Sequence, residues 1–350
     1  MKRAAIPIGV LCALSASTVW AQSSVTVYGL ADIGVQYDDP KVDGESATKN
    51  VVSGARSGSR LGFRGNEDLG GGLNAIFTIE SGINLDTGTV GQGGRMWGRQ
   101  AFVGLKSSSF GTLVAGRVGT FSSGTGSFDM IGDFDPLATS YGMAGLESSL
   151  SSTSGLRTDN TVLYQSPSWS GFQFGVAHSR QITGAEASGD DYASFFGAKY
   201  TAGKFGVAVT YDLFNTAGGG KDQKNLQVGV TYDFGVVKLF GAYGLEQNQF
   251  NADLSTTETD SGADANGYMV GFTAPLGSSG LLRASYQMRD GDNVDGDERD
   301  RRVASIAYEY MLSKRTMIYT ALSDSDGKKS LDENPDYDRR IFSLGINHRF

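Results

Sequence analysis

Apolar and polar residues alternate over long stretches of this chain, and the alternation continues to its last residue. Between residues 25 and 37 one set of alternate positions is apolar and the other is mostly polar. Successive residues of a β-strand point to opposite faces, so this period of two predicts strands with one apolar face. The same pattern recurs at 205–213, 226–232, 304–310 and 342–350. The sequence contains no helical periodicity of comparable length.

The connections between the predicted strands are of two kinds, which take turns along the chain. Short turns such as SSSFG at 107–111 alternate with long polar stretches such as 38–55 and 120–156. Short turns on one rim and long loops on the other are typical of outer-membrane barrels, and the count between them is about sixteen strands. We therefore predict an all-β fold, a transmembrane antiparallel β-barrel with short periplasmic turns and long external loops.

A soluble β-sandwich is the alternative fold, because it also alternates apolar and polar positions. A mean hydropathy of −0.23 does not decide between the two, since a barrel interleaves its apolar surface with polar residues. Aromatic residues near strand ends, as at Tyr37, Tyr164, Tyr232 and Tyr310, favour the barrel, whose interfaces carry aromatic girdles.

The first residues, MKRAAIPIGVLCALSASTVWAQ, combine a basic start, a short apolar stretch and small residues. This layout predicts a cleaved secretory signal over 1–21, which leaves 22–350 as a single barrel domain. The only cysteine, Cys12, lies in the signal, so a disulfide scaffold and a cysteine metal site are excluded. The chain carries 38 acidic and 30 basic residues, which argues against a nucleic-acid partner.

Four blocks of sequence give the predicted barrel a family resemblance. SSVTVYGLADIGVQY, SRLGFRGNEDLGGGLNAIFTIESG, GRQAFVGLKSSSFGTLVAGR and the terminal GINHRF resemble the general diffusion porins of Gram-negative outer membranes. The resemblance covers essentially the whole chain after the signal. It implies a sixteen-stranded homotrimer in the outer membrane, surrounded by lipid and lipopolysaccharide, whose third loop folds inward to narrow the pore. It also implies that the terminal aromatic, Phe350, is an assembly signal for the barrel assembly machinery.

A diffusion pore works through its radius and its electric field, so the relevant residues are charged side chains that face the lumen. Strand alternation places Arg60 opposite the apolar Leu61 and Phe63, on the lumenal face. By the resemblance, Arg60 belongs to the basic wall of the constriction. Matching the blocks adds Arg99 and Arg157 to that wall, with Arg117 as a fourth member.

The resemblance also implies that 121–149 is the pore-constricting loop. Its FDMIGDFDP sequence would then lie at mid-height in the barrel, which makes Asp129, Asp133 and Asp135 candidates for the acidic side of the constriction. The chain departs from the better-known family motif here. It has GDFDP where other members carry proline, glutamate and paired glycines, so the acid that faces the pore is left open.

These observations predict a water-filled channel for passive diffusion of small hydrophilic solutes and ions, without a cofactor or a metal. A substrate-selective channel is the alternative within transport, and scattered lumenal aromatics such as Tyr28 and Phe195 are its only sign. An outer-membrane barrel enzyme is the alternative from another class, and it would need a base near a nucleophile or an activated water. Alternation points both histidines, His178 and His348, away from the lumen.

Overall fold

The computed structural model describes residues 24–137, 155–180, 192–215, 221–249, 263–293 and 295–350. Strands dominate the described chain, together with one short helical turn, α1 (Gly91–Gly94), and a 3-10 turn, η1 (Gly132–Phe134). No helix among these residues has the length and apolar character that crossing a membrane requires. The strands are β1 (Ser24–Pro40), β2 (Thr48–Ser53), β3 (Arg60–Gly70), β4 (Leu73–Asn84), β5 (Thr89–Val90), β6 (Gln100–Ser107), β7 (Gly111–Gly119), β8 (Arg157–Gln165), β9 (Phe172–Arg180), β10 (Tyr192–Ala202), β11 (Phe205–Asn215), β12 (Gln223–Asp233), β13 (Lys238–Gln249), β14 (Ala263–Leu276), β15 (Gly280–Gly291), β16 (Arg299–Met311), β17 (Thr316–Lys329) and β18 (Arg339–Arg349).

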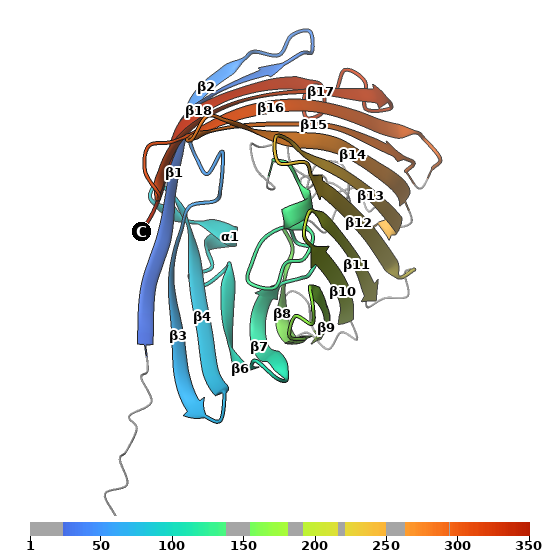
Figure 1. Cartoon of the computed structure of the whole chain (residues 1–350). Coiled ribbons are helices and arrows are strands. Elements are labelled where there is room, and N and C mark those ends of the chain that lie inside the picture. The colour runs from blue at the N-terminus through green and yellow to red at the C-terminus, as the bar shows by residue number, and fades with distance from the viewer. Residues whose placement is uncertain (1–23, 138–154, 181–191, 216–220, 250–262, 294) are drawn as a thin grey trace, which may run out of the picture.

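The strands form one sheet that closes on itself, because β18 pairs antiparallel with β1 (Figure 1). β2 and β3 pair with successive parts of β1, so together they make one interrupted barrel strand. β5 pairs only with the last residues of β4 and lies outside the ring. The 18 strands therefore give a closed antiparallel barrel of sixteen, which confirms the predicted fold and strand number.

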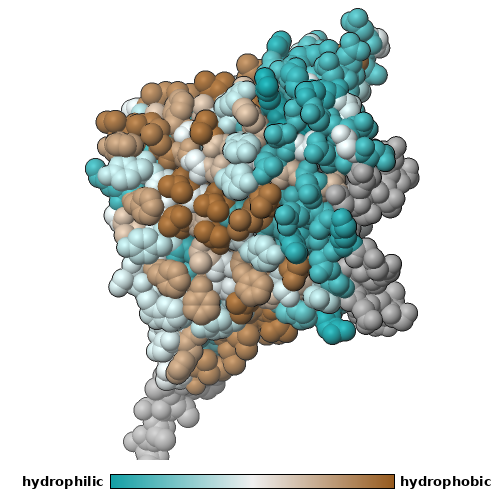
Figure 2. All heavy atoms as spheres, turned by 90° about the vertical axis from the view of Figure 1, so that its right-hand side faces the viewer, coloured by the Kyte–Doolittle hydropathy of each residue, from teal (hydrophilic) through white to brown (hydrophobic). Residues whose placement is uncertain are grey.

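Alternation separates an apolar outer face from a mixed inner one. Val25 and Val27 on β1 are 65% and 56% exposed, while Asp32, on the other face of the same strand, is fully buried. Figure 2 shows brown and pale residues gathered over a broad part of the outer surface, with teal residues along one side. Such an apolar outer band matches the hydrocarbon of a membrane, and ring closure leaves no strand edge unpaired there.

After β7 the chain turns into the barrel, and we call residues 120–137 the inward segment (Figure 1). Its Phe121, Phe128 and Met130 are buried in an apolar cluster with side chains of β6 to β11. Its Ile131 and Phe134 enter a second cluster with side chains of β11, β13 and β14. The rest of the expected constricting loop, residues 138–149, lies outside the described residues, as does the predicted signal 1–21.

Two glycines on the inner wall make room for this segment. A Cβ atom at Gly197 of β10 would lie 2.7 Å from the sulfur of Met130, and one at Gly229 of β12 would lie 2.6 Å from Cβ of Phe134. Both separations are below van der Waals contact, so any larger residue would push the segment away from the wall. Gly197 and Gly229 therefore fix where the inward segment packs against the wall.

Candidate pore constriction

A second piece of chain enters the barrel between β2 and β3. Residues 54–59, here called the β2–β3 insert, interrupt the pairing with β1 and project from the wall. Ala55 of the insert belongs to one apolar cluster with Leu137, at the end of the described inward segment, and the buried Tyr319 of β17. The lumen is thus narrowed by two elements that meet, whereas the sequence had predicted only one.

Asp32 of β1 holds the β2–β3 insert against the wall. Its Oδ1 accepts hydrogen bonds from the backbone N–H of Arg56 (3.3 Å) and the hydroxyl of Tyr319 (2.8 Å), and its Oδ2 accepts one from Nδ2 of Asn347 (2.7 Å). The N–H of Asp32 donates to Oγ of Ser59 (3.0 Å) at the other end of the insert. A buried carboxylate with several donors fixes their positions, so Asp32 sets the shape of the insert.

Arg60 and Arg99 stand beside the insert. Nε of Arg60 donates to the carbonyl of Gly58 (2.9 Å), and the guanidinium of Arg99 lies so near Gly58 that an added Cβ would be 3.1 Å from Nη1. Nε of Arg99 also donates to Oε1 of the buried Glu80 (2.7 Å), whose other oxygen accepts a hydrogen bond from Tyr28 (2.9 Å).

Arg157 opens β8 and joins the same group from the other side. Its Nη1 donates to the carbonyl of Gly155 (2.7 Å), and its Nη2 donates to Oγ1 of Thr125 in the inward segment (3.1 Å). Its charge lies close enough to those of Arg99, Arg117 and Arg60 to be repelled by all three, and Arg60 and Arg99 also repel each other. The structure thus brings Arg60, Arg99 and Arg157 together where the strand wall and the inward segment meet, and the fourth predicted arginine, Arg117, adjoins them through the carbonyl of Arg157 (3.4 Å).

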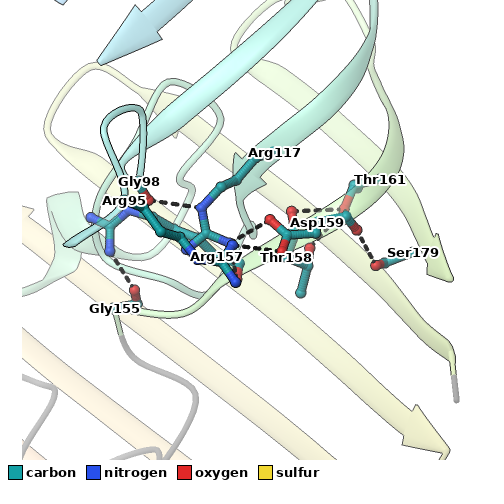
Figure 3. Close-up of polar contacts among 9 residues, drawn as sticks. All are labelled: Arg95, Gly98, Arg117, Gly155, Arg157, Thr158, Asp159, Thr161 and Ser179. Atoms are coloured by element: carbon teal, nitrogen blue, oxygen red, sulfur yellow. Dashed lines mark hydrogen bonds and ion pairs between the residues drawn. The ribbon is translucent and has the colours of Figure 1, made fainter. Parts of the chain in front are cut away.

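Arg117 differs from its predicted position. It alternates with the buried Val114 and Val118, and thus shares the outward side of β7 with the exposed Leu113. Its Nη1 reaches Asp159 (2.6 Å), which also binds Arg95 (2.6 Å) (Figure 3). Asp159 lies at an irregularity in the β7–β8 pairing, where a bulge re-aims side chains. The family resemblance assigned Arg117 to the lumenal wall, although the alternation along β7 points its side chain outward.

The three candidate acids have different surroundings. Asp129 accepts hydrogen bonds from the backbone N–H groups of Gly124 (2.9 Å), Ile131 (3.3 Å) and Gly132 (2.8 Å), and burial raises the pKa of its carboxyl. Asp135 is buried, and its Oδ1 accepts from the N–H of Leu137 (2.8 Å). Both carboxylates therefore shape turns within the inward segment.

Asp133 is the acid that faces open space. Its side chain is 80% exposed, and Oδ2 lies 3.4 Å from Nζ of Lys199 on β10. An exposed pair at that distance contributes little to stability and leaves the carboxylate accessible to solutes. Of the three candidates, Asp133 alone has its carboxylate in solvent.

Sequence reasoning did not single out Glu309 of β16. Its Oε1 accepts from Nε of Arg56 (2.6 Å), and its Oε2 forms an ion pair with Arg283 (3.0 Å). Arg283 also donates from Nη1 to the carbonyl of Pro136 in the inward segment (2.6 Å). The alternation of Glu309 with the outward Tyr308 and Tyr310 was the signal that could have found it.

The described residues around the insert carry more positive than negative charge. The guanidinium groups are those of Arg56, Arg60, Arg99, Arg157 and Arg283, and the carboxylates are those of Asp32, Glu80 and Glu309. All three carboxylates are buried, and so are Arg56 and Arg99, whereas Arg60, Arg157 and Arg283 are only partly buried, so the charge accessible from the lumen there is basic. Within the described ranges no three His, Asp or Glu side chains are grouped as metal ligands would be.

Comparison with known proteins gives the barrel a family. Residues 8–330 match the family described as Gram-negative porin. An outer membrane porin protein of Bordetella pertussis is 35% identical, with 96% of each chain covered. Outer membrane porin protein 32 of Delftia acidovorans is 33% identical, over 92% of this chain and 89% of that one.

Solved structures agree with these relatives. An anion-selective porin from Comamonas acidovorans superposes with a TM-score of 0.76 at 25% identity, covering 94% of this chain and all of the other. A trimer form of OmpT from Vibrio cholerae shares the fold at 17% identity, with a TM-score of 0.66 and coverage of 94% and 99%.

Proposed function

Because the chain belongs to the Gram-negative porin family, and is an outer-membrane channel, we propose that it passes small hydrophilic solutes by diffusion with a preference for anions. The observation that carries the preference is the cluster of Arg60, Arg99 and Arg157 beside the insert, with its carboxylates buried. The anion-selective porin from Comamonas acidovorans, which has the same fold, supports it.

The preference follows from electrostatics. Arginine stays charged at all ordinary pH values, and lumenal charges in low-dielectric walls raise the local concentration of counter-ions. Asp133 would supply the negative side of a transverse field, because Asp129 and Asp135 are committed to backbone donors. In this proposal the basic wall outweighs a single exposed carboxylate, so anions pass more readily than cations.

The first test is the zero-current potential of the purified protein in a planar bilayer under a potassium chloride gradient. Anion preference makes the dilute side negative, because chloride crosses faster than potassium. A positive dilute side would overturn the proposed preference while leaving the channel itself intact.

Two alternative functions find less support in the structure. A track of lumenal aromatics would favour one specific nutrient, yet Phe195, Phe214 and Phe240 are buried in the seat of the inward segment. For an enzyme, His178 and His348 would be the natural bases, and they bond to Ser194 and Thr316 on the outer face. Diffusion of solutes is therefore the function that we propose, rather than catalysis.

We also propose that the channel is a homotrimer in a bilayer of lipid and lipopolysaccharide. On the outer face of β1, β2, β17 and β18, an apolar hollow of about 560 Å³ centres on Gly34 and Gly345, which suits close approach of another surface. Current steps that close in threes, and the mass of a trimer in detergent, are the expected results. Independent single steps together with a monomer mass would contradict it.

We propose that residues 1–21 are a cleaved export signal and that Phe350 is read by the barrel assembly machinery. The backbone of Phe350 exchanges two hydrogen bonds of 3.1 Å with Gly29, and the residue is 51% exposed on the outside of the closing strands. Deleting Phe350 should greatly lower the amount of assembled barrel while the pores that form conduct normally. Unchanged assembly would reject the assembly role, and an N-terminus at Met1 in the mature protein would reject cleavage.

A further inference from the structure

On the periplasmic side of the constriction, the inner wall contains a cavity whose cationic lining residues are not part of the proposed constriction. It measures about 520 Å³ and lies between β1, β3, β4, β6, β7, β8 and the inward segment. Its lining includes Thr26, Arg64, Thr78, Phe102, Lys106 and Phe128. The cavity is near the rim of short turns, which is periplasmic in an outer-membrane barrel, and its volume is in the range of small-molecule sites.

Two cations reach this cavity at different heights. Arg64 pairs across the sheet with Thr26 and Thr78, whereas Lys106 pairs with Asn74 and Thr112, closer to the periplasmic rim. The guanidinium of Arg64 lies 5.1 Å from the centre of the Tyr28 ring, which favours one orientation of the cation.

Neither cation is matched by an acid in the cavity. Among the described residues, none of those that line it is an aspartate or a glutamate. Asp68 lies at the neighbouring turn, where its Oδ1 accepts a hydrogen bond from the N–H of Gly70 (2.8 Å). The cavity therefore presents positive charge to whatever enters it.

Part of the cavity lining is apolar and aromatic. The rings of Phe102 and Phe128 pack with their centres 5.4 Å apart, and Ile76 lies beside them. Phe128 belongs to the inward segment, which is held there by a hydrogen bond from the N–H of Ser127 to Oε1 of Gln100 (3.1 Å). Simple inorganic anions would use the cations and leave this apolar part unused.

We propose that this cavity is a periplasmic-side binding site for small organic anions that join a carboxylate to a compact apolar body, such as an aromatic monocarboxylate. The inference rests on the proposed anion-preferring pore and adds a class of solute to it. Arg64 offers paired donors to the carboxylate, Lys106 adds a second positive charge, and the apolar body packs against Phe102, Phe128 and Ile76.

The test is block of chloride current by benzoate in single channels under symmetric salt. A thiol reagent added to one side of a Ser109→Cys channel, which carries its label in the short turn between β6 and β7, identifies the periplasmic side. Benzoate should block at lower concentration from that side than from the other. Acetate, which lacks the ring, should need about tenfold more, because less apolar surface is buried.

Three variants locate the site. Arg64→Gln and Lys106→Gln should each weaken block by benzoate about tenfold, the usual effect of removing one charge-assisted contact. Lys238→Gln is the matched control, because Lys238 lies over Phe240 of β13, with 4.8 Å between Nζ and the ring centre, and does not line the cavity. Block by benzoate should be unchanged in this control.

Two outcomes would overturn the site. Equal weakening in all three variants would show only the general charge of the lumen, and equal block by acetate and benzoate would remove the apolar contact. The zero-current potential in potassium chloride is a separate reading on the same channels. A channel that fails the benzoate test and still prefers chloride refutes the site alone, whereas cation preference refutes the proposed function.

Discussion

Two parts of the chain narrow this barrel, and they are held in place by different kinds of contact. The inward segment is seated by apolar packing, with Phe121, Met130 and Phe134 pressed against small residues of the wall. The β2–β3 insert is held by hydrogen bonds to two buried carboxylates, that of Asp32 and that of Glu309, which binds Arg56. The two meet at Ala55 and Leu137, yet they draw on different strands.

These two kinds of contact control different properties of the pore, namely its shape and its charge. The wall of β10 and β12 places Gly197 and Gly229 against the inward segment and so sets where that segment lies. The wall beside the insert carries Arg60 and Arg99, whose positions depend on polar contacts to Gly58 and Glu80. Mutations of the first wall should therefore change pore size, and mutations of the second should change ion preference.

The largest effect is expected from Gly197→Val. The new side chain would overlap Phe121 and Met130, so the inward segment should leave its seat, single-channel conductance should rise, and stability should fall by about 1–3 kcal/mol. Conductance and urea unfolding measure the two results. Gly241→Val is the matched control, because an added Cβ there meets no atom within 4 Å. Normal conductance in a folded Gly197→Val channel would show that the glycine seat does not set the pore.

Asp32→Asn tests the polar anchor. The substitution replaces one acceptor oxygen with an amide donor, which faces either Asn347 or the two donors Tyr319 and Arg56, at a cost of about 2 kcal/mol. We expect a lower unfolding midpoint and a noisier open-channel current, because the insert is released while the inward segment stays seated. Asp39→Asn on the same strand is the control. A quiet current with normal stability would mean that other contacts hold the insert.

The double change Arg60→Gln with Arg157→Gln addresses charge without shape. The ratio of anion to cation permeability should fall about tenfold, while conductance in concentrated salt changes little. Arg117→Gln removes the same kind of charge from the outward side of β7 and should leave the ratio unchanged. A similar fall of the permeability ratio in Arg117→Gln would mean that Arg117 acts on the lumen after all.

Alternation predicted the strands and the face of most of their residues, and the pattern of short turns and long loops predicted the barrel and its strand number. Alternation could not predict the β2–β3 insert, since ARSGSRLGF reads as a continuous strand and the break depends on Asp32, far away in the sequence. It also could not sort Asp129 from Asp133, because an aspartate in a loop serves equally to accept backbone N–H groups or to face solvent.

The smallest effect is expected from Asp133→Asn, which removes the one exposed carboxylate among the three loop candidates. Because its partner Lys199 is 3.4 Å away and the carboxylate is open to solvent, stability should change by less than about 1 kcal/mol. The anion preference should increase by less than about twofold at physiological salt, and more at low salt where screening is weaker. Zero-current potentials at two salt concentrations measure both results. A large increase would mean that Asp133 balances the arginines across the pore, and a decrease would contradict its assignment as the negative side of the field.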